Sequence, residues 1–65
     1  MSEKSRQNIG NIVRTFRKQQ GLTEEQLAKK AGVSRQVLRN VESGNANVTL
    51  STLDKLGEAL GVELY

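Results

Sequence analysis

Four side chains that can make paired hydrogen bonds lie within six residues of one another: Arg35, Gln36, Arg39 and Asn40. An arginine guanidinium can donate two hydrogen bonds to O6 and N7 of guanine, and a glutamine or asparagine carboxamide can bind N6 and N7 of adenine. These base atoms line the major groove of double-stranded DNA, which is wide enough to admit a helix. The four residues therefore suggest a base-reading surface, provided that they share one face of a helix.

The residues around this cluster predict that helix. At about 100° per residue, the four side chains and Ser43 fall on one side. On the other side three apolar side chains gather: Val37, Leu38 and Val41. Ser34 is a suitable N-cap and Gly44 a suitable end, so we expect a helix at residues 34–43 with its apolar side buried. An ordinary solvated helix face is also polar, so helical position alone leaves both interpretations open.

A second short helix is predicted immediately upstream. Thr23 is a natural N-cap, and Gln26, three residues later, completes a capping box. We expect this helix at residues 24–31, ended by Gly32 in the left-handed conformation. Because so few residues separate the two helices, they cannot lie antiparallel and must cross at a steep angle. Residues 23–43 are therefore predicted to form a helix-turn-helix.

Two further helices are expected to support this pair. The first occupies about residues 6–20, after a frayed segment at residues 1–5, and its apolar side consists of Ile9, Ile12, Val13 and Phe16. The fourth begins after a Thr49 cap and carries an apolar stripe formed by Leu50, Leu53, Leu56 and Leu60. Gly57 inside it is expected to be a local weakness. The whole chain, residues 1–65, then forms a single all-α domain.

The last four residues, 62–65, follow a different pattern. They alternate apolar and polar side chains, which is typical of a strand or of the start of a C-terminal extension. Val62, Leu64 and Tyr65 are the apolar residues there that the helical core does not use. We expect them to form the contact between two copies of the chain.

The composition excludes several classes of protein. The sequence has no cysteine and no histidine, so it lacks disulfides, thiol and imidazole catalysis, and the usual zinc-ligand sets. A chain of 65 residues also has little room for the concave site of an enzyme. We therefore expect no catalytic residues, no metal site and no cofactor. No apolar run approaches the ~20 residues of a membrane-spanning helix, and a cytoplasmic location is expected.

The charge is divided unevenly along the chain. Residues 1–40 carry nine basic and three acidic side chains, a net charge of +6, whereas residues 41–65 carry one basic and four acidic side chains, a net charge of −3. This asymmetry suits a polyanion approached from one side. Because many small domains are mildly basic, the charge supports nucleic-acid binding only together with the polar helix face.

Several short motifs resemble those of the Xre family of phage-repressor-type, λ-repressor-like helix-turn-helix regulators. The matching strings are GLT at 21–23, LAKKAGVS at 27–34, ESG at 42–44 and NVTLSTL at 47–53. The resemblance covers residues 9–62, and the tail together with residues 49–52 is similar, more loosely, to the HipB-like antitoxin branch. It implies a compact four- to five-helix DNA-binding domain that regulates transcription, by repression, as a homodimer on a palindromic operator.

The resemblance also implies roles for individual residues. Arg35, Gln36 and Asn40 match the base-reading positions of the family's recognition helix, and Arg39 shares their face. Arg17 and Glu42 match a partly buried ion pair that ties the first helix to the third.

The expected contacts with the phosphate backbone are a wider set of residues: Thr23, Glu24, Ser34, Ser43, Arg14 and Lys29. Glu24 occupies a position that is often a phosphate-binding glutamine, so its carboxylate is a departure and the backbone N–H groups would have to hold the phosphate. Asn45 and Asn47, in the loop after the third helix, could bind phosphate only as neutral donors. Ser34 is first an N-cap, and Lys29 equally suits the helix dipole.

The alternative function is a protein-binding module on the same fold, such as an antitoxin or a co-regulator with an unknown protein partner.

Overall fold

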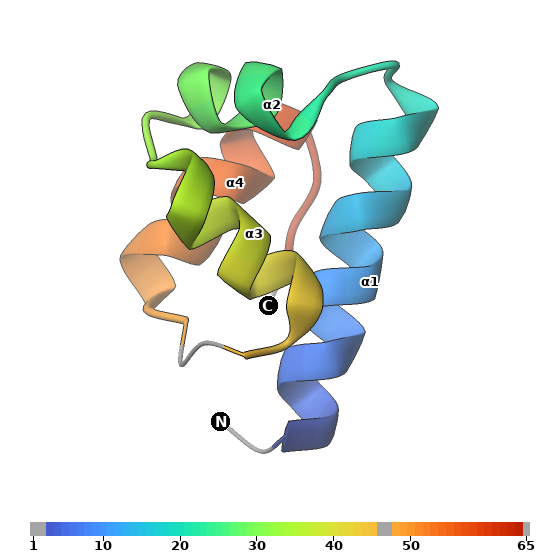
Figure 1. The fold of residues 1–65 in the computed structure, drawn as a ribbon, viewed down its shortest axis with the longest axis vertical. Coiled ribbons are helices and arrows are strands. Elements are labelled where there is room, and N and C mark those ends of the chain that lie inside the picture. The colour runs from blue at the N-terminus through green and yellow to red at the C-terminus, as the bar shows by residue number, and fades with distance from the viewer. Residues whose placement is uncertain (1–2, 46–47, 65) are drawn as a thin grey trace.

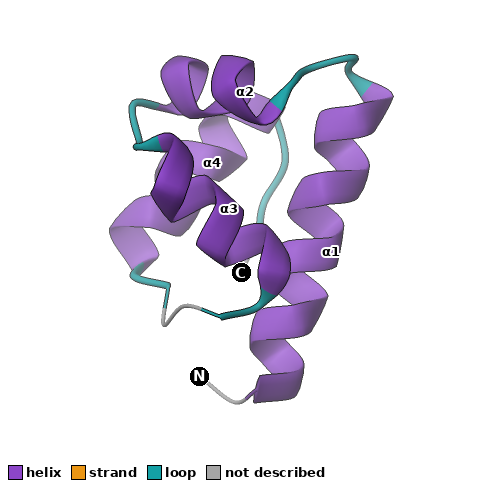
Figure 2. Cartoon of the chain, viewed as in Figure 1, coloured by secondary structure: helices purple, strands orange, loops and turns teal. Residues whose placement is uncertain are grey.

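The computed structural model describes residues 3–45 and 48–64, and these residues form four α-helices and no strand (Figures 1 and 2). The helices are α1 (Glu3–Gln19), α2 (Glu24–Ala31), α3 (Arg35–Ser43) and α4 (Leu50–Leu60). Figure 1 shows α1 along one side, α2 across one end, and α3 in front of α4. The predicted all-α architecture is confirmed. Within the described residues, no helix is long and apolar enough to cross a membrane.

Local capping sets the ends of the three shorter helices. Thr23 Oγ1 accepts a hydrogen bond from Gln26 N–H at 3.1 Å, and Gln26 Oε1 accepts one from Thr23 N–H at 2.9 Å, which completes the predicted capping box. Ser34 caps α3 and Thr49 caps α4 in the same way, each through its side-chain oxygen. The three helices therefore begin directly after the predicted caps Thr23, Ser34 and Thr49.

Both ends of the chain differ from prediction. The first helix begins at Glu3, so residues 3–5, which were expected to fray, are helical. Residues 62–64 form no strand, and Leu64 lies in the core with 9% of its surface exposed. The expectation that Leu64 lies outside the helical core is therefore wrong. Residues 1–2 and Tyr65, about which the same predictions were made, lie outside the described residues, as does Asn47.

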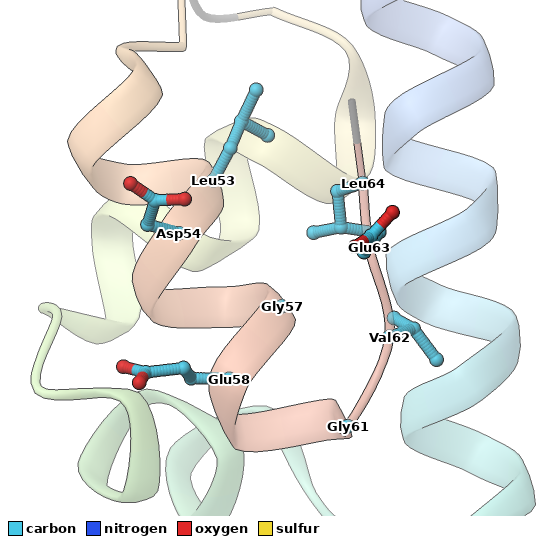
Figure 3. A pocket seen from close by; sticks show the side chains of 8 residues that line it. All are labelled: Leu53, Asp54, Gly57, Glu58, Gly61, Val62, Glu63 and Leu64. Atoms are coloured by element: carbon cyan, nitrogen blue, oxygen red, sulfur yellow. The ribbon is translucent and has the colours of Figure 1, made fainter.

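Gly57 explains how the tail reaches the core. Val62 N–H donates to the Gly57 carbonyl at 3.0 Å, and a Cβ at position 57 would lie 2.6 Å from the Val62 oxygen. The missing side chain therefore lets the tail run back closely alongside α4, as Figure 3 shows, and Leu64 reaches the core. Gly57 is a packing requirement in this fold as well as a weak helix former.

The core gathers the inner faces of all four helices. Its fully buried side chains are Val13, Leu27, Leu38, Val41, Leu53 and Leu56. Three residues that were expected to be buried are instead exposed: Ile12 by 42%, Val37 by 39% and Leu50 by 63%. Ile12 and Val37 lie at the margin of their apolar faces and Leu50 is the first residue of its helix, so neighbouring helices do not cover them.

The tightest crossing in the core lies between α1 and α3. Gly10 is buried there, and a Cβ at this position would lie 2.9 Å from the Glu42 carbonyl oxygen and closer still to that of Val41. Real Cβ atoms do not approach backbone oxygens so closely, so only glycine permits this separation of the two helices.

An ion pair adds a second link between the same helices. Arg17 Nε donates to Glu42 Oε2 at 2.8 Å and Arg17 Nη2 donates to Glu42 Oε1 at 3.0 Å. The side chains are only 12% and 7% exposed, respectively. Arg17 Nη1 also donates to the Leu22 carbonyl at 2.9 Å, which ties the α1–α2 connection to the pair. The pKa of Arg17 is raised above its usual value, chiefly by the hydrogen bond to the Glu42 carboxylate.

Gly10→Ala is expected to lower the free energy of unfolding by about 1–3 kcal/mol, because the added methyl group overpacks the α1–α3 crossing. Denaturant unfolding measures this change. Asn11→Ala is the control, since Asn11 is exposed on the same helix and alanine is the better helix former. A Gly10→Ala chain as stable as the Asn11→Ala chain would contradict the close crossing.

Glu42→Gln is expected to cost about 3 kcal/mol of stability, because it leaves the guanidinium of Arg17 buried without its counter-charge. Thermal unfolding of Glu42→Gln and of Glu63→Gln, whose carboxylate is exposed in the tail, gives the comparison. An exposed carboxylate contributes ~1 kcal/mol or less. Equal melting temperatures for the two variants would show that the Arg17–Glu42 pair does not hold the fold together.

Candidate DNA interface

The turn between α2 and α3 sets the direction of the predicted recognition helix. Gly32 takes the left-handed conformation with φ 74°, and Val33 N–H donates to the Ala28 carbonyl at 3.0 Å. Ser34 then opens α3, and its Oγ accepts from Val37 N–H at 3.0 Å. Figure 1 shows that α3 runs away from α2 instead of alongside it. This is the helix-turn-helix arrangement predicted for residues 23–43.

The four predicted base-reading residues share the outer side of α3. Arg35, Gln36 and Arg39 are exposed and Asn40 is half-buried, while the buried residues of the helix are Leu38 and Val41. Gln36 Nε2 donates to Asn40 Oδ1 at 3.0 Å, so the two carboxamides are held side by side. This hydrogen bond leaves Gln36 Oε1 available as an acceptor and Asn40 Nδ2 available as a donor. The edge of adenine presents a donor at N6 and an acceptor at N7, which these two groups can bind.

The predicted phosphate contacts divide into two groups. Thr23 and Ser34 use their hydroxyl oxygens to cap α2 and α3, and Lys29 is exposed in the last turn of α2. The other members lie around one polar hollow of about 300 Å³, whose lining is Arg14, Arg17, Glu24, Arg39, Glu42 and Ser43. The structure therefore brings Arg14, Glu24 and Ser43 together beside α3, and it places Arg39 with them.

The charges around this hollow do not cancel. Arg17 and Glu42 neutralise each other, which leaves Arg14 and Arg39 opposite the single carboxylate of Glu24. Glu24 is half-buried, and its charge contributes to raising the pKa of Arg17, after the larger effect of Glu42. The hollow is thus positive on balance and can accept an anion, although Glu24 weakens that attraction.

The side of the molecule formed by α4 and the tail carries negative charge, unlike the hollow beside α3. A hollow of about 580 Å³ lies over α4 and the tail. Its lining includes three carboxylate side chains, those of Asp54, Glu58 and Glu63, and the apolar residues Leu53 and Leu64, and Figure 3 labels these side chains. In this view α3 lies behind α4, whereas in Figure 1 it lies in front. Carboxylates repel the phosphate backbone, so DNA is expected to approach from the α3 side.

Val37 is the residue of α3 that the sequence pattern places wrongly. It was expected on the buried side, but 39% of its surface is exposed. The available signal was its position at the edge of the apolar side, next to Asn40, about 60° away on the helical wheel. Sequence reasoning therefore missed an apolar side chain that lies beside the polar recognition face.

Comparison with known proteins places this geometry in a family. A family model described as Helix-turn-helix, HTH_3, matches residues 13–65. The immunity repressor protein of Bacillus phage phi105 is 39% identical over 56 residues, which cover 86% of this chain and 39% of the repressor. The antitoxin HipB of Escherichia coli is 32% identical over 56 residues, 86% of this chain and 64% of HipB.

A solved structure shows the same fold at nearly full length. The restriction-modification controller protein C.AhdI from Aeromonas hydrophila superposes with a TM-score of 0.86 at 36% identity, over 91% of this chain and 89% of the C.AhdI chain. The predicted resemblance to Xre-type regulators is confirmed by these relatives. This chain belongs to the HTH_3 helix-turn-helix family.

Proposed function

We propose that this chain binds double-stranded DNA in a sequence-specific manner, through α3 in the major groove, and represses transcription in the cytoplasm. The observation that carries the proposal is the outer side of α3, where Arg35 and Gln36 are exposed in the first turn, next to a positively charged hollow. Relatives described as an immunity repressor and as a controller protein support the same function.

Two roles are assigned within the interface. Arg35, Gln36 and Asn40 read base edges, because their side chains extend from the exposed side of the helix. Arg14, Ser43 and the main chain at Glu24 hold the phosphate backbone from the hollow beside α3. Arg39 lies in both sets, since it belongs to α3 and also lines the hollow. Thr23, Ser34 and Lys29 complete the phosphate contacts from the ends of α2 and α3.

The main alternative is a protein-binding module, which the antitoxin relative brings into consideration. Salt dependence distinguishes the two functions. Binding to duplex DNA releases counterions, so the observed affinity must fall steeply as salt increases. A chain that shows no affinity for duplex DNA at low salt would favour the protein-binding module.

We also propose that the chain acts as a homodimer on a palindromic operator. One short recognition helix contacts too few base pairs to specify a genomic site, and two-fold dimers bind half-sites about 34–36 Å apart. Leu64 is a core residue, so the tail is no longer a suitable contact between copies. Leu50, 63% exposed at the start of α4, offers an apolar surface that needs no change in the fold.

Arg35→Ala and Gln36→Ala are each expected to cost about 1–3 kcal/mol of binding free energy on the preferred site and to relax selectivity at one base position. Binding to the selected site and to random duplex DNA measures both effects, with Lys55→Ala as the control because Lys55 is an exposed cation on α4. Equal losses on both DNAs would make these residues phosphate contacts. If neither variant loses affinity for the selected site or for random DNA, α3 is not the recognition helix.

Leu50→Ser is expected to weaken self-association and operator binding together while the melting temperature stays unchanged, because the side chain is already exposed. Sedimentation, operator titration and thermal unfolding give the three readings. Ile12→Ser is the matched control, since Ile12 is an exposed apolar residue of α1. A Leu50→Ser chain that dimerises as before would exclude the start of α4 as the dimer contact.

A further inference from the structure

Val37 of α3 is an apolar residue that lies outside the buried core, with 39% of its surface exposed. Val37 is one of three large apolar side chains that are exposed in the described part of the chain, and the other two lie on α1 and α4. Its own N–H donates to Ser34 Oγ at 3.0 Å. This bond fixes Val37 in the first turn of α3, the part of a recognition helix that contacts base edges.

The neighbours of Val37 define what this side chain could contact. Gln36 precedes it in the chain, and Asn40 lies about 60° from it around the helix. These two carboxamides are joined by the 3.0 Å hydrogen bond described above. Val37 therefore lies, partly exposed, next to an amide pair whose chemistry suits adenine.

Major-groove chemistry supplies a partner for such an arrangement. Thymine is the base that carries a methyl group, at C5, and this group projects into the major groove, where apolar side chains contact it. In an A·T pair, adenine offers N6 and N7 while thymine offers the methyl group on the same groove floor. An amide and a neighbouring valine can thus read the two bases of A·T pairs together.

We propose that Val37 is a specificity-determining residue that reads a thymine C5-methyl group next to an adenine bound by Gln36 or Asn40. This inference rests on the proposed function, since it requires α3 to lie in the major groove. It adds an apolar contact to a recognition surface that the sequence pattern describes as entirely polar. It also predicts that the preferred site contains thymine at a defined position in each half-site.

The experiment uses a duplex site selected from a random library by the full chain. Each thymidine of the site is replaced in turn by deoxyuridine, which removes only the C5-methyl group. The wild-type chain is expected to lose about three- to five-fold in affinity at one thymine of each half-site, the loss expected when one methyl group leaves an apolar contact. Val37→Ala is expected to bind the thymine site more weakly by a similar factor and to be insensitive to uracil at that position.

Two controls keep the outcomes distinct. Val37→Ala should keep a melting temperature close to that of the wild-type chain, because Val37 lies outside the buried core with 39% of its surface exposed and alanine is the better helix former, and Ile12→Ala should keep the full response to uracil. The inference is overturned if the selected site contains no thymine, if uracil changes nothing, or if Val37→Ala responds to uracil as the wild type does. In all three outcomes the chain still binds duplex DNA. A chain that selects no duplex at any salt concentration would instead refute the proposed function.

Discussion

The contact between α1 and α3 is the constraint on which the rest of the structure depends. The α3 helix has nine residues, too few for a stable helix in isolation. Gly10 lets α1 approach the last turn of α3, and Arg17 binds Glu42 in that same turn through two hydrogen bonds. The helix that carries the proposed recognition surface is thus held by the helix farthest from it in the chain.

The same arrangement separates structure from recognition on α3. Leu38 and Val41 face the core and Glu42 is paired with Arg17 of α1, so the side chains that hold the helix are engaged within the protein. Arg35 and Gln36 lie on the remaining, exposed side of the helix, where a substitution removes no core contact. Changes of base preference are therefore compatible with an unchanged fold.

Charge separates the two sides of the molecule in a similar way. Arg14 and Arg39 gather around the hollow beside α3, whereas the carboxylates of Asp54, Glu58 and Glu63 surround the hollow on the other side. This polarity orients the molecule toward a polyanion before any specific contact forms. Glu24 is an exception on the positive side, and its carboxylate keeps the attraction to phosphate moderate.

The parts of the fold that local chemistry controls were predictable from the sequence. Thr23, Ser34 and Thr49 each bond to an N–H three residues later, so neighbouring residues alone define where the helices begin. Other features depend on how separate segments pack, so the hydrophobic pattern of one segment does not predict them. These features are the close approaches at Gly10 and Gly57 and the return of Leu64 to the core.

In the candidate site, too, some features follow from local sequence and others from how the helices pack. The polar side of α3 follows from the helical repeat and was predictable. The exposure of Val37 depends on how far the neighbouring helices extend, and the gathering of Arg14, Glu24 and Arg39 around one hollow depends on how three helices pack. Neither could be derived from one segment of sequence.

Methylation interference on a selected duplex tests the central claim most directly. Dimethyl sulfate modifies N7 of guanine in the major groove and N3 of adenine in the minor groove, and it reports on both grooves in one experiment. If α3 lies in the major groove, guanine N7 methylation within each half-site will block binding, and adenine N3 methylation within the same half-site will not. Interference confined to adenine N3 would place the protein in the minor groove and contradict the recognition role of α3.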